Sequence, residues 1–384
     1  MRFHTLDSWR GVCAILVALM HFPFLGHQYM LPFVRDSYLF VDFFFVLSGF
    51  VITHAYGGKL GDWRSAGRFM VRRIGRVWPL HIFALSLFVA LELAKYLLAG
   101  HLGGAQHAPF TGATSIETLF TNIFLIHATG IHDVPASWNG PSWSISAEFI
   151  VYGLFALVTI AFGSRRAVVL VVLSAVCAAV LLTLSPKYMN AAMDFGLARC
   201  VFGFTVGHLV YLLHQRQARQ SGGVPKYGSW IEAACLTLVG LFIAKVGQTP
   251  LSVTAPLLFG VVVHVFASGD GIFTGLLSTR PFRLLGELSF SIYMMHGFLI
   301  EMLLKLAGAL EKTTGWPVKV TLPDESVVVS AGGLWATDTF ILPYLAAVVI
   351  VSWFTYRLIE LPGQRLFNNL RIARPRIEAP QPAL

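Results

Sequence analysis

Residues 6–21 read LDSWRGVCAILVALMH, an apolar run with Arg10 near its start and His21 at its end. At about 100° per residue, the eleven steps between these two residues complete nearly three helical turns, so both side chains are predicted on one face. They would lie ~16 Å apart along the axis, which puts His21 near a bilayer midplane if Arg10 is at the surface. An ionisable group at that depth usually faces a protein interior or a wet cavity and has a function. The alternative is a packing pair, with Arg10 reaching the headgroups and His21 bonded to a neighbouring helix.

The composition indicates a membrane protein. Of the 384 residues, 56% are hydrophobic and only 12% are charged, whereas soluble domains have about 25% charged residues. The four cysteines (Cys13, Cys177, Cys200 and Cys235) all fall in apolar segments without metal-ligand spacing. We therefore expect small apolar fillers and no metal site.

Ten apolar segments are long enough to cross a bilayer. Their approximate ranges are 8–26, 38–56, 78–99, 145–162, 167–184, 196–213, 229–246, 251–267, 286–306 and 338–357. The predicted fold is therefore an all-α polytopic membrane protein with about ten transmembrane helices. One membrane-embedded domain is expected over residues 1–362, followed by a Pro-rich, disordered tail over 363–384. The first segment lacks a small-x-small cleavage site, so we interpret it as a retained span rather than a signal peptide.

The basic residues indicate an orientation. Lys and Arg gather in alternate loops and in the tail, whereas residues 101–143 contain neither. The positive-inside rule then places the N- and C-termini in the cytoplasm. Because the net charge of +9 follows this alternation, and no basic face carries base-stacking aromatics, we expect contact with membrane lipids and none with nucleic acid.

A run of arginines precedes the third apolar segment. Arg73 and Arg76 are three residues apart, so they project to one side of a helix. Guanidinium groups in such an arrangement can bind phosphates in a fork geometry. The alternative is that they only set topology and contact anionic lipid headgroups.

A motif with Trp143, Ser144 and Glu148 forms the outer entry to the fourth segment. Ser144 and Glu148 are four residues apart and share a helix face. A carboxylate one turn inside the membrane is suited to proton transfer. The alternative is that Glu148 only satisfies the positive end of the helix dipole.

Two further segments supply polar side chains at membrane depth. Ser289, Tyr293 and His296 follow the i, i+4, i+7 pattern of one helix face and would line a polar cavity or an interhelical seam. Asp42 lies near the outer end of the second segment and is another candidate for the cavity lining. The adjacent Ser48-Gly49 pair permits close helix approach.

Taken together, these segments resemble the acyltransferase 3 family of integral membrane O-acyltransferases. The motifs that carry the resemblance stand in family order: Leu6-Asp7-Ser8-x-Arg10-Gly11 to His21, the Asp42–Phe50 run, Arg73-x-x-Arg76-x-x-Pro79, Ser142-Trp143-Ser144-x-x-x-Glu148, Gly286-x-x-Ser289-x-x-x-Tyr293-x-x-His296 and Tyr356-Arg357-x-x-Glu360-x-Pro362. Each motif is short, but the ordered set is specific and spans nearly the whole chain.

The resemblance implies ten membrane helices and transfer of an acyl group, usually acetyl, from cytoplasmic acyl-coenzyme A (acyl-CoA, most often acetyl-CoA). The implied acceptor is a hydroxyl of a glycan or a lipid-linked sugar, and the implied location is a bacterial inner membrane. Arg10, His21, Arg73 and Arg76 match positions that are functional in the family. Glu148 matches a carboxylate in or near the site.

The physical properties of the residues fit such a donor. Arg73, Arg76 and Arg10 would hold the phosphates of acyl-CoA, and the thioester would then extend toward His21. His21 would act as a general base on the acceptor hydroxyl or would take the acyl group itself, and both roles stay open. We expect His21 and Glu148 to meet in one cavity, with Glu148 in its outer half. The competing hypotheses are a secondary transporter, which also needs buried ionisable residues, and a non-catalytic membrane scaffold.

Overall fold

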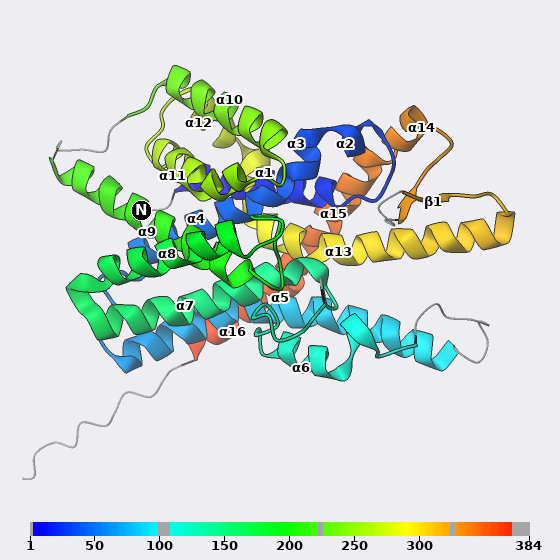
Figure 1. Ribbon diagram of the computed structural model, residues 1–384, viewed down its shortest axis with the longest axis horizontal. Coiled ribbons are helices and arrows are strands. Elements are labelled where there is room, and N and C mark those ends of the chain that lie inside the picture. Colours follow the sequence, from blue (N-terminus) through cyan, green and yellow to red (C-terminus); the bar gives the residue numbers. More distant parts are fainter. Residues whose placement is uncertain (1–2, 99–107, 135, 221–225, 323–326, 371–384) are drawn as a thin grey trace, which may run out of the picture.

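The computed structural model describes residues 3–98, 108–134, 136–220, 226–322 and 327–370. It is almost entirely helical, which confirms the predicted fold class (Figure 1). The long helices are α1 (His4–Met20), α4 (Phe40–Tyr56), α5 (Trp63–Leu98), α7 (Trp143–Phe162), α8 (Arg166–Thr183), α9 (Gly196–Gln220), α10 (Ser229–Val246), α11 (Ala255–Phe266), α13 (Arg280–Thr314) and α15 (Ile341–Thr355).

Shorter elements connect the long helices. The short α-helices are α2 (His27–Met30), α3 (Pro32–Arg35), α6 (Ile116–Ile123), α12 (Ile272–Leu277), α14 (Leu334–Asp338) and α16 (Leu361–Asn369). Single 3₁₀ turns are η1 (Asp36–Leu39), η2 (Gly112–Thr114), η3 (Gly140–Ser142), η4 (Gly163–Arg165) and η5 (Pro250–Thr254), and the turn η6 (Tyr356–Glu360) is π-helical. Two strands, β1 (Lys319–Thr321) and β2 (Val327–Val329), pair antiparallel.

Each of the ten predicted segments overlaps one long helix. Within the described ranges, seven helical stretches are long and apolar enough to span a membrane, and one of them, Gly140–Thr183, contains both α7 and α8. α1 and the stretch Pro250–Phe266 are shorter. Ten membrane crossings and two cytoplasmic termini therefore stay predictions.

The first helix ends earlier than predicted. α1 stops at Met20 rather than near residue 26, and His21 is its C-cap. The chain then becomes extended and pairs with β2: the Val329 N–H donates to Pro23 O at 2.7 Å, and the Leu25 N–H donates to Val329 O at 2.8 Å. Pro23 has no N–H to continue the helix, so the backbone finds its partners in the hairpin instead.

The third helix begins earlier than predicted. α5 starts at Trp63, where Asp62 accepts a hydrogen bond from the Ser65 N–H at 2.6 Å, and it continues through Pro79 to Leu98. At 1.5 Å per residue, its 36 residues extend ~54 Å, well beyond a hydrocarbon core of about 30 Å. The arginine run is therefore part of the same rigid helix as the apolar span.

The tail begins later than predicted. We predicted a disordered segment from residue 363, whereas 363–369 belong to α16. This helix packs on α5, because a Cβ added to Gly75 would lie 2.3 Å from the Phe367 side chain and one added to Gly363 would lie 2.6 Å from Pro79. Residues 371–384 lie outside the described residues.

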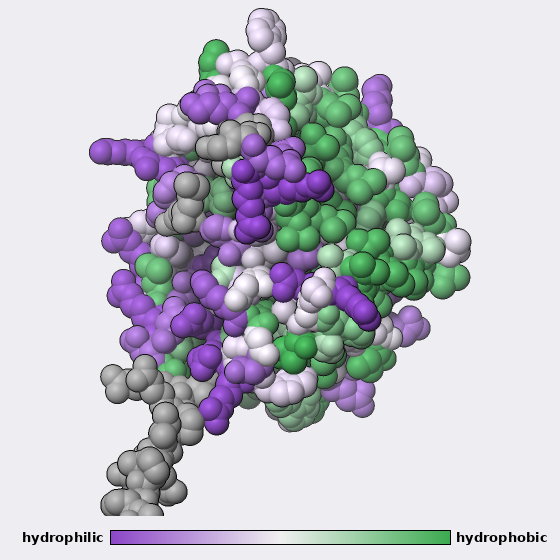
Figure 2. All heavy atoms as spheres, turned by 90° about the vertical axis from the view of Figure 1, so that its left-hand side faces the viewer, coloured by the Kyte–Doolittle hydropathy of each residue, from purple (hydrophilic) through white to green (hydrophobic). Residues whose placement is uncertain are grey.

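Close helix pairs form the centre of the bundle. α4 and α9 touch through backbone atoms, since a Cβ on Gly49 would lie 1.9 Å from Phe204 O and one on Gly207 would lie 1.8 Å from Val46 O. Small residues at such crossings let helices approach closely in a membrane, which confirms the packing role predicted for Gly49. Seen from the end that carries the start of α1, hydrophilic residues gather on one part of the surface and apolar residues cover the neighbouring flank (Figure 2).

Gly207→Ala is expected to destabilise the protein, because the new methyl group meets the backbone of α4 and forces the helices apart. The matched control is Gly240→Ala in α10, where an added Cβ meets no atom within 4 Å. That control should leave stability equal or raise it by about 0.5–1 kcal/mol through helix propensity. Thermal unfolding in detergent would check both, and equal melting temperatures for the two variants would contradict the assigned contact.

Candidate active site

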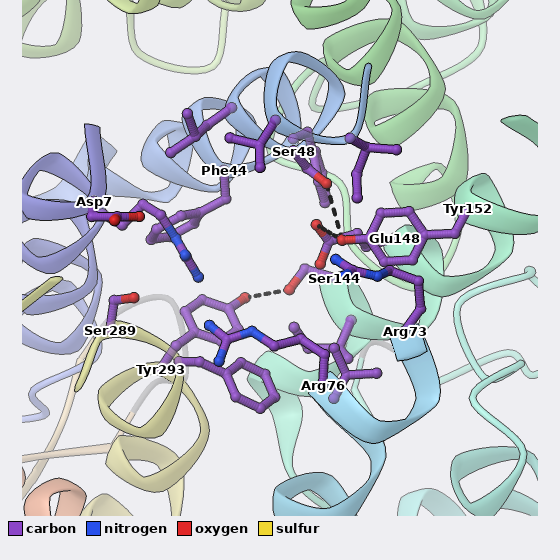
Figure 3. A pocket seen from close by; sticks show the side chains of 18 residues that line it. Asp7, Phe44, Ser48, Arg73, Arg76, Ser144, Glu148, Tyr152, Ser289 and Tyr293 are labelled. Carbon is purple, nitrogen blue, oxygen red and sulfur yellow. Dashed lines mark hydrogen bonds between the residues drawn. The ribbon is translucent and has the colours of Figure 1, made fainter. Parts of the chain in front are cut away.

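A cavity of about 140 Å³ lies between α1, α4, α5, α7 and α13 (Figure 3). Its apolar wall comes mainly from α4. Its polar lining consists of Asp7, Arg10, Ser48, Arg73, Arg76, Ser144, Glu148, Tyr152, Ser289 and Tyr293. Seven of the eleven residues singled out from the sequence, from four segments far apart in the chain, thus meet in one cavity; Asp42, Trp143, His21 and His296 do not line it.

Two of the cavity's arginines have no counter-ion. Neither Arg10 nor Arg73 forms an ion pair with any carboxylate in the described ranges. The Arg73 guanidinium instead lies over the rings of Tyr56 and Tyr152, with 5.4 and 5.8 Å between its central carbon and the ring centroids. Its buried Nε also lacks a hydrogen-bond partner. Guanidinium groups that form no direct ion pair in the described ranges are chemically suited to binding an anion, although Asp7 and Glu148 line the same cavity.

The third arginine is held differently. Arg76 forms an ion pair with Glu360, a buried carboxylate that also accepts a hydrogen bond from the Ser291 hydroxyl at 2.8 Å. Glu360 is the last residue of the π-helical turn η6, a local geometry that often marks functional sites. Arg76 therefore lines the cavity with its charge already balanced and its position fixed.

Glu148 lies at the end of a hydrogen-bonded row. The Tyr152 hydroxyl donates to Glu148 Oε1 at 2.7 Å, so the 3.0 Å contact between Ser48 and Tyr152 must use the Ser48 proton. Figure 3 shows Arg73 reaching toward the same carboxylate. The row from α4 to α7 fixes one carboxylate oxygen and leaves the other toward the cavity.

A second hydrogen-bonded pair forms part of the cavity wall. The Ser144 hydroxyl donates to the Tyr293 hydroxyl at 2.8 Å, and Tyr293 donates onward to Pro141 O at 2.9 Å. Ser289 also faces the cavity, and its buried hydroxyl has no partner in the described structure. The face predicted for Ser289 and Tyr293 is thus a cavity wall.

His21 lies outside the cavity, next to the residues that pack on Tyr293. Its ring is exposed but does not line the cavity. The ring centroid lies 5.0 Å from that of buried His296, which lies 5.7 Å from the Tyr293 ring. The expectation that His21 and Glu148 share one cavity is not met by this cavity, which Glu148 and Tyr293 line and His21 does not.

The hydrogen bonding of His21 defines its tautomer. Its Nδ1 lies 2.9 Å from Val17 O, and since a carbonyl only accepts, Nδ1 carries the proton of the neutral ring. Nε2 therefore presents its lone pair. His296 is arranged in the same way, with Nδ1 3.2 Å from Ile292 O and a buried Nε2 that has no partner.

Asp42 and Trp143 lie outside the cavity and support its walls. Asp42 forms a fully buried ion pair with Arg199 of α9, with 2.7 Å between Oδ2 and Nη2. The guanidinium also lies 5.0 Å above the Trp143 ring, at the start of the helix that carries Ser144 and Glu148. These contacts join α4, α7 and α9.

Sequence reasoning missed several of these residues. Tyr152 and Ser48 were not singled out as functional, although Tyr152 follows Glu148 by four residues, the spacing of a shared helix face. Glu360 appeared only within a motif, and Arg199 had no signal beyond being a charge in an apolar segment. In the described ranges, no group of three or more His, Cys, Asp or Glu side chains is placed to hold a metal ion.

Comparisons with known proteins show the family to which the chain belongs. Residues 3–357 match the family described as "Acyltransferase domain", Acyl_transf_3. The chain is 25% identical to acyltransferase MdmB of Streptomyces mycarofaciens over 95% of this chain and 87% of that protein. It is 34% identical to protein 2 in the picA locus of Rhizobium radiobacter, over 40% of this chain and 81% of that protein.

A further relative is the peptidoglycan O-acetyltransferase OatA of Listeria monocytogenes. It is 22% identical over 93% of this chain, and the chain spans 55% of its length. No solved structure matches the chain significantly.

The helical fold and the family match define a membrane-embedded O-acyltransferase. They favour this class over a secondary transporter or a scaffold. The chain belongs to the acyltransferase 3 family.

Arg76→Met is expected to destabilise the protein more than Glu360→Gln. Removing the arginine leaves a carboxylate that is 1% exposed without a counter-ion, and breaking a buried pair in this way costs about 3–5 kcal/mol. Removing the carboxylate leaves an arginine that is 26% exposed and that water in the cavity screens. Thermal unfolding of both variants and of the double variant checks this. The double variant should regain stability, and a further loss would show that the two side chains are not a pair.

Proposed function

We propose that the protein transfers an acyl group, most often acetyl, from acyl-CoA to a hydroxyl of a glycan or a lipid-linked sugar. The observation that carries the proposal is the pair of arginines, Arg10 and Arg73, that face one cavity of a membrane domain and form no direct ion pair within the described ranges. A polyanionic donor such as coenzyme A would neutralise them. The name of the Listeria relative, a peptidoglycan O-acetyltransferase, supports a sugar acceptor.

In this proposal the donor enters from the cytoplasm and the positive-inside orientation holds. Arg10 and Arg73 bind its phosphates, and Arg76 contributes a fixed, charge-balanced wall. The pantetheine arm then runs along the cavity toward Ser144 and Tyr293. The apolar wall from α4 excludes water from the thioester, which limits hydrolysis before the acceptor is bound.

His21 approaches the reaction from the other side of Tyr293. Because its ring is exposed without lining the cavity, an acceptor hydroxyl reaches it from another face of the molecule. We propose that His21 Nε2 takes the hydroxyl proton as the oxygen attacks the thioester carbonyl carbon. The carbon–sulfur bond then breaks, and the same proton returns to the leaving sulfur. A rotation of Tyr293 away from Ser144 would bring the two halves into contact.

Glu148 serves the donor side in this arrangement, not the outer half that the sequence suggested. Its carboxylate stands in the same cavity as Arg10 and Arg73 and accepts from Tyr152. A fixed negative charge there orients the guanidinium groups without neutralising either by a direct ion pair. Glu148 thereby keeps the cations in position while the donor is absent.

His21→Ala is expected to lower acyl transfer by about 10²–10⁴-fold, the usual contribution of a general base, while donor binding stays normal. His27→Ala is the matched control, because His27 lies six residues further on and pairs with Asp338. The measurement is acceptor-dependent coenzyme A release by purified protein. Near-normal turnover of a folded His21→Ala variant would refute the role of His21.

Arg73→Ala is expected to raise the donor KM about tenfold or more, because a charge-assisted hydrogen bond is worth about 1.5–3 kcal/mol. Added salt should weaken donor binding in the unaltered protein and less so in the variant. Arg72→Ala is the control, since Arg72 is exposed and does not line the cavity. If both variants keep the normal donor KM, the arginine run serves topology alone.

A further inference from the structure

A second hollow adjoins the cavity. It has a volume of about 230 Å³ and lies beside the first turns of α1 and α13. Its lining is His4, Asp7, Arg280, Arg283, Leu284 and Glu287. Asp7 lines both the hollow and the cavity, so the two spaces lie against the same residue.

A backbone contact between two helices fixes this junction. A Cβ on Gly11 would lie 2.4 Å from the carbonyl carbon of Leu285, and one on Gly286 would lie 2.4 Å from Asp7 O. Because neither helix can move away without losing this packing, Asp7 stays next to the first turns of α13. Arg283 lies one turn before Gly286 and lines the same hollow as Asp7, which also lines the cavity.

The charges of the hollow are not paired with one another. Arg280 and Arg283 are both exposed, and neither forms an ion pair with a carboxylate in the described ranges, although Glu287 lines the same hollow. The dipole of α13 does not stabilise them either, since cations are unfavourable in the first turn of a helix. Topology alone explains two arginines at this end of the bundle, but it does not explain why they line a hollow that opens next to the cavity.

The size of the donor requires a second space. Pockets that enclose a drug-sized ligand have volumes of about 300–1,000 Å³, whereas the cavity has only about 140 Å³. If the thioester of acyl-CoA reaches Tyr293 and the pyrophosphate lies at Arg10 and Arg73, the cavity is filled by the acyl group, the pantetheine arm and the pyrophosphate. The nucleotide, with its separate 3′-phosphate, must then lie outside the cavity and next to its opening.

We propose that this hollow binds the adenosine 3′-phosphate end of the donor, an inference that rests on the proposed function. Arg280 and Arg283 bind the 3′-phosphate, while Arg10 and Arg73 hold the pyrophosphate. Glu287 accepts a hydrogen bond from the adenine amino group, and the exposed Leu284 side chain packs on the ring. The cations match the phosphate of an adenine nucleotide, the carboxylate matches its amino group, and the apolar side chain matches its ring.

The test compares coenzyme A with 3′-dephospho-coenzyme A, which lacks only the phosphate assigned to the hollow. Binding of each to the purified full chain in nanodiscs is measured by calorimetry. The unaltered protein is expected to bind coenzyme A about tenfold more tightly than the dephospho form. Arg280→Gln and Arg283→Gln should lose this preference while they still bind the dephospho form normally.

The matched control is Arg357→Gln. Arg357 is also exposed, lines a separate hollow that shares Glu287, and lies over the Trp353 ring at 4.4 Å. It should keep the preference for coenzyme A. Equal affinity of the unaltered protein for both compounds would overturn the proposal. Loss of binding of both compounds by Arg283→Gln would also overturn it.

Anionic lipid headgroups carry the same phosphate chemistry and form the second arm of the test. The measurements are repeated in nanodiscs of phosphatidylcholine alone and with phosphatidylglycerol added. If Arg280 and Arg283 bind lipid headgroups, their variants change only how the binding affinity depends on phosphatidylglycerol. They then keep the preference for coenzyme A, and this result overturns the proposal. Failure of the unaltered protein to bind either compound would instead refute the donor assigned under the proposed function.

Discussion

The structure depends on how charges are balanced inside an apolar bundle. An unpaired buried charge is costly in a low dielectric, so the chain pairs most of the charges it buries. Asp42 with Arg199 and Glu360 with Arg76 each join helices that are distant in sequence. In the cavity, Arg10, Arg73 and Glu148 form no direct ion pair in the described part of the chain. The paired charges hold the walls in place, and the arginines without an ion pair are the ones that we propose bind the anionic donor.

The same division separates two kinds of functional residue. Some residues lie outside the cavity, contact the helices that line it and determine where the cavity residues lie. They are Glu360, Arg199 and Trp143. Glu148, Tyr152 and Ser48 form a continuous row between α7 and α4, so a change in one of them alters the position of the others. The site is therefore a set of coupled side chains from five helices rather than a pair of catalytic residues.

Helical periodicity was sufficient to predict the fold and much of the cavity. Apolar runs identified every long helix, and the spacing of Arg73 with Arg76 and of Ser289 with Tyr293 placed these side chains on cavity-facing sides. The ends of helices were less predictable, because Pro23 and the hairpin decide where α1 stops. Partners from other helices, such as Arg199 for Asp42, have no local pattern, and so Asp42 was assigned to the wrong space.

The pairing of Pro23 and Leu25 with β2 has an evolutionary consequence. It ties the surroundings of His21 to the 315–333 loop, while the cavity with its arginines is built from other parts of the chain. A sequence change in that loop can therefore alter the surroundings of His21, where we propose that the acceptor binds. The cavity that we assign to the donor would stay the same. Related proteins can in this way keep the same donor cavity while they diverge in the acceptor that they modify.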